Sequence, residues 1–139
     1  MRGKFNKASL YVISGFYILA GFNHFIDPSF YYPLIPPAFP QPELINILSG
    51  IAEVILGIGF FSPKTRKFSA FAVIGLLIAF IPSHVYFIQI GSCIENGLCV
   101  SEWIGWIRLI VIHPLLILWA YSVSKTNAQL LDLKKPILQ

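Results

Sequence analysis

The chain has 139 residues, of which 56% are hydrophobic and 12% are charged, and its mean hydropathy is +0.73. An ordinary soluble domain carries about 25% charged residues, so this composition excludes a soluble globular domain and indicates a membrane protein. The net charge of +4 does not point to nucleic acid, because nine of the ten basic residues lie near the two chain ends and in one short loop.

Four apolar stretches are each close to the length of about 20 residues that crosses a bilayer as a helix. They cover residues 8–26, 44–62, 68–91 and 103–123. We therefore predict an all-α fold, a polytopic membrane protein with a four-transmembrane-helix bundle, in one domain that comprises residues 1–139. A cleaved signal peptide is the alternative for the first stretch. Its 19 residues exceed an apolar signal region of about 7 to 15 residues, so we expect a retained helix.

The positions of the basic residues predict the orientation of this bundle. They precede the first stretch, lie between the second and the third, and follow the fourth, which places them on one side of a four-span topology. By the positive-inside rule that side is cytoplasmic. Both termini and a tail at 124–139 are then cytoplasmic, and the loops at 27–43 and 92–102 are outside. The expected location is the cell membrane (inner or plasma membrane), as a multi-pass protein.

The first outer loop, residues 27–43, contains six prolines and several large apolar side chains. Proline lacks an amide donor and restricts the residue before it, so we expect an irregular segment without a regular helix. Its aromatic side chains favour a position flat on the outer end of the bundle. There it acts either as a lid over a site or as a plain interfacial anchor, and the sequence does not separate these two readings.

The second outer loop contains both cysteines, Cys93 and Cys99, with an Asn-Gly pair between them. In an oxidising compartment, two thiols at this spacing across a turn are expected to form a disulfide. A structural disulfide is favoured over a redox-active pair, because the spacing is not the C-x-x-C that tunes thiol reactivity.

Five ionisable residues lie within the predicted spans, in the outer half or near the midplane: His24, Glu53, His84, Arg108 and His113. A charged side chain at the centre of a bilayer costs about 2.5 kcal/mol even on insertion scales, so a chain that keeps one there has a partner or a use for it. We take these five residues as the candidate ligand-binding pocket. No H-x-x-x-H or E-x-x-H spacing connects them, so we expect neither a metal site nor a haem.

The spacing of small and polar residues suggests which helix faces meet inside the bundle. The stripes are Ser14, Tyr17, Gly21 and His24; Asn46, Gly50, Glu53 and Gly57; Ala72, Gly75, Ala79 and Pro82; and Ser101, Gly105 and Arg108. Glu53 and Arg108 are expected to face each other, either in a ligand site or as a structural ion pair that fixes helix register. On ideal helices, His84 and His113 point away from these stripes. We therefore expect some of the five ionisable residues to line a pocket and the others to lie at a second helix interface. His24 also fits a plain hydrogen-bonding role at a helix end.

Several short motifs in the first two helices and the turn after them belong together. They are Gly-x-x-His-Phe at Gly21, His24 and Phe25; Pro36 and Pro37; Ser-Gly-x-x-Glu at Ser49, Gly50 and Glu53, followed by Gly57; and a basic turn around Pro63, Thr65 and Arg66. With these motifs the chain resembles the DoxX family of small four-helix membrane proteins, in particular its DoxX-like branch. The resemblance covers roughly the first two thirds of the chain. The fourth helix departs from the family's Arg-x-Pro, because the proline after Arg108 is displaced to Pro114, and His84 stands where an Asn is expected.

The resemblance implies a redox-associated membrane component linked to thiol or sulphur oxidation and to the quinone pool. We therefore expect a polar intramembrane pocket for a quinone-like or other small amphipathic ligand. As an enzyme, the protein would be a membrane subunit of a quinone-linked oxidoreductase with a membrane or extracytoplasmic redox partner. The alternative is a non-catalytic membrane assembly factor or a structural subunit. A lipid-binding protein or an isomerase of similar build is less favoured, and transport is disfavoured by the lack of ionisable residues in the inner half of the spans. The remaining expected partners are the lipid bilayer and a further copy of the chain, with no nucleic acid.

Overall fold

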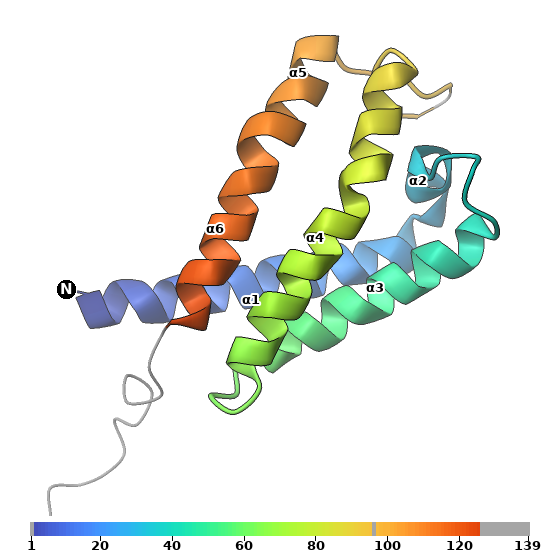
Figure 1. Ribbon diagram of the computed structural model, residues 1–139. Coiled ribbons are helices and arrows are strands. Elements are labelled where there is room, and N and C mark those ends of the chain that lie inside the picture. The colour runs from blue at the N-terminus through green and yellow to red at the C-terminus, as the bar shows by residue number, and fades with distance from the viewer. Residues whose placement is uncertain (1, 96, 126–139) are drawn as a thin grey trace, which may run out of the picture.

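The computed structural model describes residues 2–95 and 97–125, and within them the chain is helical without a β-strand (Figure 1). The long helices are α1 (Arg2–Ile26), α3 (Pro42–Gly59), α4 (Arg66–Gln89) and a last helix built from α5 (Glu102–Ile107), a π-helical turn η2 (Arg108–Ile112) and α6 (His113–Ser124). Among the described residues, four helices are long and apolar enough to cross a membrane: Lys7–Ile26, Pro42–Gly59, Arg66–Gln89 and Glu102–Ser124. The predicted all-α class with four such helices is confirmed. Beyond Lys125, the predicted tail at 124–139 lies outside the described residues.

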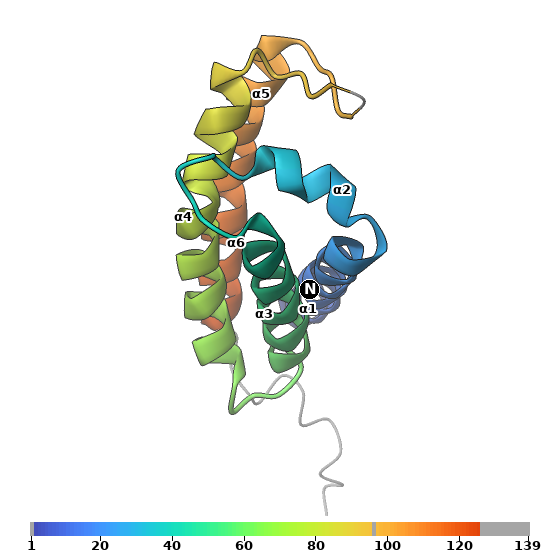
Figure 2. The same cartoon turned by 90° about the vertical axis from the view of Figure 1, so that its right-hand side faces the viewer.

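The helices form two pairs, α1 with α3 and α4 with α6, and the pairs cross at an open angle (Figures 1 and 2). At one end, apolar side chains from all four helices pack into a common core around the turn between α3 and α4. Its fully buried members include Leu10, Phe60, Val73 and Ala120. The pairs are therefore joined by packing at this end.

Glycines allow α1 and α3 to approach closely, as small residues do in membrane helix pairs. A Cβ atom added at Gly50 would lie 2.8 Å from the Cβ of His24 and 2.9 Å from the Gly21 carbonyl oxygen. Gly57 has a comparable contact, at 2.9 Å from the backbone nitrogen of Ile18. All eight residues of the two stripes predicted on these helices are buried, so that part of the prediction is confirmed.

The stripe predicted on the third helix is wrong. Gly75 and Ala79 are exposed, and the buried residues of α4 up to its midpoint are instead Arg66, Ser69, Ala70, Val73 and Leu77. The prediction took small residues as the packing face, whereas α4 packs through an apolar stripe whose spacing continues to His84. Consequently His84 lies on the inward side of α4.

The last helix contains a π-helical turn, which ideal-helix geometry does not anticipate. The backbone N–H of His113 donates to the carbonyl of Arg108, five residues earlier. Pro114 follows directly and has no N–H to give to the carbonyl of Ile110, so a wider turn just before it relieves the missing bond and the ring clash. Residues five apart lie nearly above each other in such a turn, which brings Arg108 and His113 to the same side of the helix.

The first outer loop contains two short helical turns, α2 (Pro28–Tyr31) and η1 (Tyr32–Leu34), where the sequence predicted none. Each has a proline at one of its first two positions, where a missing N–H costs nothing. The Asp27 side chain caps α2 by accepting from the backbone N–H of Phe30 at 3.3 Å. Because η1 contacts α4, this loop extends from the first helix pair to the second (Figure 2).

The second outer loop carries the predicted disulfide between Cys93 and Cys99, which is confirmed. The two cysteines form an isolated antiparallel bridge, and the backbone N–H of Ile94 donates to the carbonyl of Leu98 at 3.0 Å. Just before it, Ser92 has a positive φ of 54° and is buried. The disulfide thus closes a compact turn between α4 and α5.

Candidate functional site

A cavity of about 510 Å³ lies between the two helix pairs, beneath the first outer loop. Most of its lining is apolar, with side chains from all the long helices and from the loop. Among the apolar lining residues are Phe16, Leu34, Phe39, Leu76, Phe80 and Leu116. The cavity is thus a mainly apolar space with few polar groups, as ligand sites in proteins commonly are.

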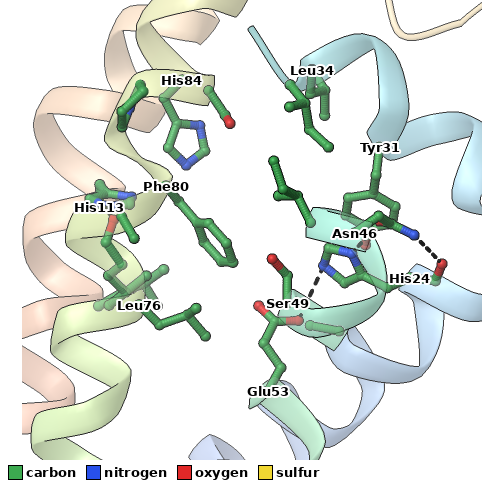
Figure 3. Close-up of a pocket in the computed structure, with 18 of the residues that line it drawn as sticks. His24, Tyr31, Leu34, Asn46, Ser49, Glu53, Leu76, Phe80, His84 and His113 are labelled. Carbon is green, nitrogen blue, oxygen red and sulfur yellow. Dashed lines mark hydrogen bonds and ion pairs between the residues drawn. The ribbon is translucent and has the colours of Figure 1, made fainter. Parts of the chain in front are cut away.

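All five residues of the predicted pocket line this one cavity: His24, Glu53, His84, Arg108 and His113. The expectation that some of them lie at a second helix interface also holds in part, because His113 packs between α6 and α4, where its Nε2 lies 2.7 Å from the Leu77 carbonyl. They form two groups on opposite walls (Figure 3). His24 and Glu53 belong to the α1–α3 pair, and His84 and His113 face them from α4 and α6. That these residues bind a ligand stays a prediction.

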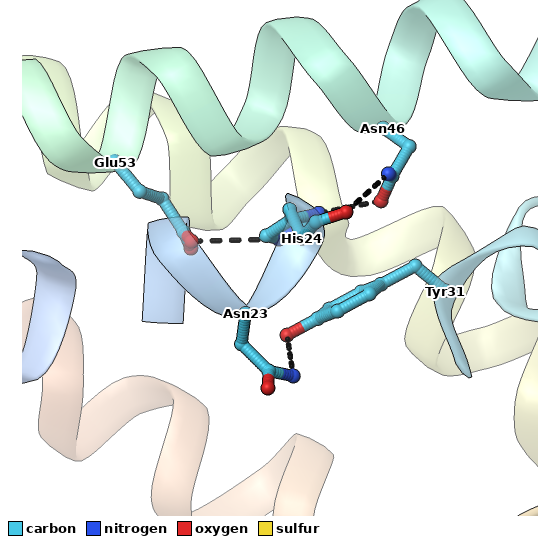
Figure 4. A network of polar contacts seen from close by, with 5 residues as sticks. All are labelled: Asn23, His24, Tyr31, Asn46 and Glu53. Atoms are coloured by element: carbon cyan, nitrogen blue, oxygen red, sulfur yellow. Dashed lines mark hydrogen bonds and ion pairs between the residues drawn. The ribbon is translucent and has the colours of Figure 1, made fainter. Parts of the chain in front are cut away.

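His24 is held by a reciprocal contact with Asn46 (Figure 4). The Asn46 Nδ2 donates to the backbone carbonyl of His24 at 2.9 Å, which fixes the orientation of the amide. The other amide atom, Oδ1, then accepts from His24 Nδ1 at 2.6 Å. Because an amide oxygen has no proton to give, the Nδ1 atom of His24 must carry one. The remaining ring nitrogen, Nε2, is therefore the one that faces Glu53.

Glu53 lies against the Nε2 side of His24. His24 Nε2 is 3.4 Å from Glu53 Oε2, and both side chains are more than nine tenths buried. This contact is an ion pair by distance, and Oε2 makes no hydrogen bond within the described residues. The imidazole gives Glu53 a basic partner, which lowers the cost of keeping an acid within the spans.

The structural ion pair that was one of the two alternatives for Glu53 and Arg108 is wrong, while the other alternative, that both belong to a ligand site, stays a prediction. Among the described residues, the ion pair of Glu53 is with His24, and none joins Arg108 to an acid. The prediction assumed that the second and fourth helices face each other, whereas α3 packs most closely on α1. Arg108 is half-buried and lines the opposite side of the cavity, where its charge acts on Tyr31 and His84.

Tyr31, from α2, lies over this network. Its ring stacks on the ring of His24 with centroids 3.7 Å apart, and its hydroxyl accepts from Asn23 Nδ2 at 2.9 Å (Figure 4). Burial raises the pKa of Tyr31 above its ordinary value of 10.0, and the negative charge of Glu53 adds to the rise, while the Asn23 bond and Arg108 oppose it. The phenol is therefore neutral at physiological pH, with a hydroxyl hydrogen still free to donate.

Sequence reasoning did not identify Tyr31, Asn23 or Asn46 as site residues. Asn46 stood on the predicted buried stripe of its helix, and a buried amide needs partners, so this signal was available. Tyr31 lies in the proline-rich loop, where nothing in the spacing distinguishes it from its aromatic neighbours. Its place over His24 depends on the turn that α2 makes after Asp27.

On the opposite wall, the rings of His84 and His113 are in contact, with centroids 4.9 Å apart and planes at 74°. His113 Nε2 lies 2.7 Å from the backbone carbonyl of Leu77, which can only accept, so Nε2 is the donor. This bond ties α6 to α4 and fixes the ring of His113. Across the described part of the chain, no group of three or more His, Cys, Asp or Glu side chains is placed to hold a metal ion.

Fold and site together define a four-helix protein of membrane-spanning character with a half-polar cavity between two helix pairs. The chain belongs to the family described as a domain of unknown function, DUF8561, whose sequence model matches residues 13–124. That range includes every residue of the candidate site and all the long helices, α1 only from residue 13 onwards. No curated protein and no solved structure matches the chain. The matching family does not carry the DoxX name, so the resemblance to DoxX proteins stays a hypothesis.

Proposed function

We propose that this protein binds a quinone-like or other small amphipathic ligand in the cavity, as a redox-associated membrane protein of DoxX-like type. The proposal places it in the cell membrane with both termini and the α3–α4 turn on the cytoplasmic side, following the distribution of basic residues. The cavity, the loop that roofs it and the disulfide loop then lie towards the outer surface. An extracytoplasmic or membrane redox partner is the expected source of electrons.

One observation carries this proposal: two buried oxygen atoms beside the cavity have no hydrogen-bond partner among the described residues. They are the hydroxyl of Tyr17 and Oε2 of Glu53, on the facing stripes of α1 and α3, and both residues line the cavity. A buried polar atom left unsatisfied costs about 1 to 3 kcal/mol, and native proteins keep few of them without a use. A ligand hydroxyl would donate to Oε2 of Glu53, and a ligand carbonyl would accept from the hydroxyl of Tyr17.

The His24–Glu53 pair gives this site a chemical capacity. Reduction of a quinone to a quinol consumes protons together with electrons, and oxidation releases them. An acid and a base whose facing atoms are 3.4 Å apart would exchange protons with a ligand oxygen bound within hydrogen-bond reach of Glu53 Oε2. The residues of this chain would thus hold and move protons, while the electrons come from the partner.

Thermal unfolding in lipid nanodiscs tests the proposal, with decylubiquinone as the probe. We expect the probe to raise the melting temperature of the wild-type protein and Glu53→Gln to remove that rise while the protein still folds. Glu43→Gln is the matched control, because Glu43 is an exposed residue at the start of the same helix and does not line the cavity. An unchanged melting temperature of the wild-type protein with added quinone would remove the basis of the proposal.

A non-catalytic assembly factor or structural subunit is the second candidate. The observation that favours it is that His24 and Asn46 satisfy each other across the α1–α3 interface, with Glu53 in ion-pair contact beside them, as in a purely structural network. On this reading, Glu53→Gln mainly lowers stability and changes no response to ligand. A partner protein, or a second copy of the chain, would then co-purify in mild detergent whether or not quinone is added.

A further inference from the structure

The positive charge of Arg108 has no acidic ion-pair partner in the described part of the chain. Its guanidinium belongs to the cavity lining, and its field reaches Tyr31 on one side and His84 on the other. The acid expected to pair with it, Glu53, is engaged by His24 instead. Within a span, a lone half-buried arginine is costly unless something of opposite charge comes to it.

The charged residues of the cavity lining leave Arg108 without an acid beside it. Glu53 is the only acid among the residues that line the cavity, and its ion-pair contact is with His24. The charge of Arg108 therefore has no acidic partner within the lining. A neutral ligand would leave this charge as it is, whereas an anionic one would neutralise it.

The distribution of apolar residues indicates how such a ligand would lie. Arg108 stands about one and a half helical turns inside the end of the last helix that lies next to the roofing loop. Towards the common core, the lining is apolar, with Phe16, Leu76, Leu77 and Leu116. A head near Arg108 and the roof would leave an alkyl chain pointing into this apolar part.

We propose that the cavity takes a single-chain amphiphile with an anionic head, and that Arg108 is the residue that binds the head. This inference rests on the proposed function, since it requires that the cavity bind an amphipathic ligand, and it adds the charge of that ligand. A guanidinium binds a carboxylate or a phosphate through paired N–H groups, so either head fits the chemistry. The anion is either a free amphiphile or the headgroup of an anionic membrane lipid.

Binding of two probes with the same chain tests the inference: dodecanoate, which is anionic, and dodecanol, which is neutral. In phosphatidylcholine nanodiscs, we expect the wild-type protein to bind dodecanoate at least about tenfold more tightly than dodecanol. Arg108→Gln should lose this preference but still bind dodecanol, which shows that the cavity is intact. Arg108→Lys keeps the positive charge but lacks the paired N–H donors, so this variant should retain part of the preference for dodecanoate. Lys125→Gln removes an exposed cation outside the cavity and should change nothing.

The same measurement in phosphatidylglycerol nanodiscs separates the two sources of the anion. If the lipid headgroup occupies Arg108, dodecanoate binds more weakly there than in phosphatidylcholine, and Arg108→Gln abolishes the difference. Equal affinity of the wild-type protein for both dodecyl probes, or a preference that survives in Arg108→Gln, would overturn the inference alone. Absence of binding by both dodecyl probes and by decylubiquinone would overturn the proposed function as well.

Discussion

His24 presents its Nε2 atom to the carboxylate of Glu53 because Asn46 occupies the other ring nitrogen. This relationship explains why an acid can lie inside an apolar helix of this chain: it has a basic partner whose ring orientation is fixed. The same contact joins α1 to α3 and lines the cavity. The pair therefore contributes both to the packing of two helices and to the chemistry of the proposed site.

Substitutions of Glu53 should separate its charge from its hydrogen bond. In Glu53→Gln the amide can donate to His24 Nε2, so we expect a loss of less than about 1 kcal/mol in the free energy of unfolding. Glu53→Leu leaves the buried ring nitrogen without a partner and should cost about 1 to 3 kcal/mol. Chemical unfolding in detergent measures both, and a leucine variant as stable as the wild-type protein would contradict the pairing.

Asn46 should contribute more to stability than Asn23, although both are asparagines of the same network. Asn46→Ala removes the partner of two buried groups of His24, and we expect it to cost about 1 to 3 kcal/mol. Asn23 is exposed and makes one bond to Tyr31, so Asn23→Ala should cost about 0.5 to 1 kcal/mol. Unfolding experiments on the two variants compare them directly. The reverse order of effects would show that His24 is not held as described.

Glycine-to-alanine substitutions test the close contact of α1 and α3. At Gly50 the added methyl group would meet the Cβ of His24 at 2.8 Å, so we expect Gly50→Ala to cost about 1 to 3 kcal/mol and to displace His24. Gly75 has no atom within 4 Å of the same position, and Gly75→Ala should be neutral or stabilising because alanine favours the helix. Thermal unfolding reports both effects, and equal behaviour of the two variants would refute the interface.

The ionisation of Tyr31 should follow its burial over His24. Its raised pKa means that the folded protein holds the phenolic proton more tightly than the unfolded chain does. This stabilisation of the folded protein is thus fully present at a pH below 10.0, the ordinary pKa of tyrosine, and is lost as the pH rises through the raised pKa of Tyr31. The ultraviolet absorbance of tyrosinate, measured as the difference between wild-type protein and Tyr31→Phe, gives this titration. A Tyr31 that ionises at or below 10.0 would mean that the loop does not close over His24.

Hydropathy predicted the four helices well, because a helix of membrane-spanning length leaves a long apolar run in any sequence. The helix bounds observed differ from those predicted mainly at α1, which begins at Arg2, within the basic residues that precede the apolar run. The facing stripes of α1 and α3 were also predictable, since glycine and polar residues recur there at heptad-like spacing. The polar stretch between Cys93 and Cys99 likewise indicated the disulfide.

The partners of the ionisable residues could not be predicted in the same way. Which helices pair is a property of the whole bundle, and no residue pattern favours packing of α3 against α1 over packing against the last helix. The π-helical turn that begins at Arg108 changes the direction of every side chain after it. The only sign of this turn in the sequence is Pro114. Tyr31 reaches His24 through a turn of a proline-rich loop whose path depends on Asp27.

Photolabelling gives the most direct test of the central claim, which is that an amphipathic ligand occupies the cavity between the helix pairs. A dodecanoate that carries a diazirine on its chain would be activated on the protein in nanodiscs, and the adducts mapped by mass spectrometry. We predict adducts on the cavity residues Tyr17, Leu76 and Phe80. Adducts confined to exposed residues outside the cavity, such as Leu19, Ile55 and Leu118, would contradict the claim.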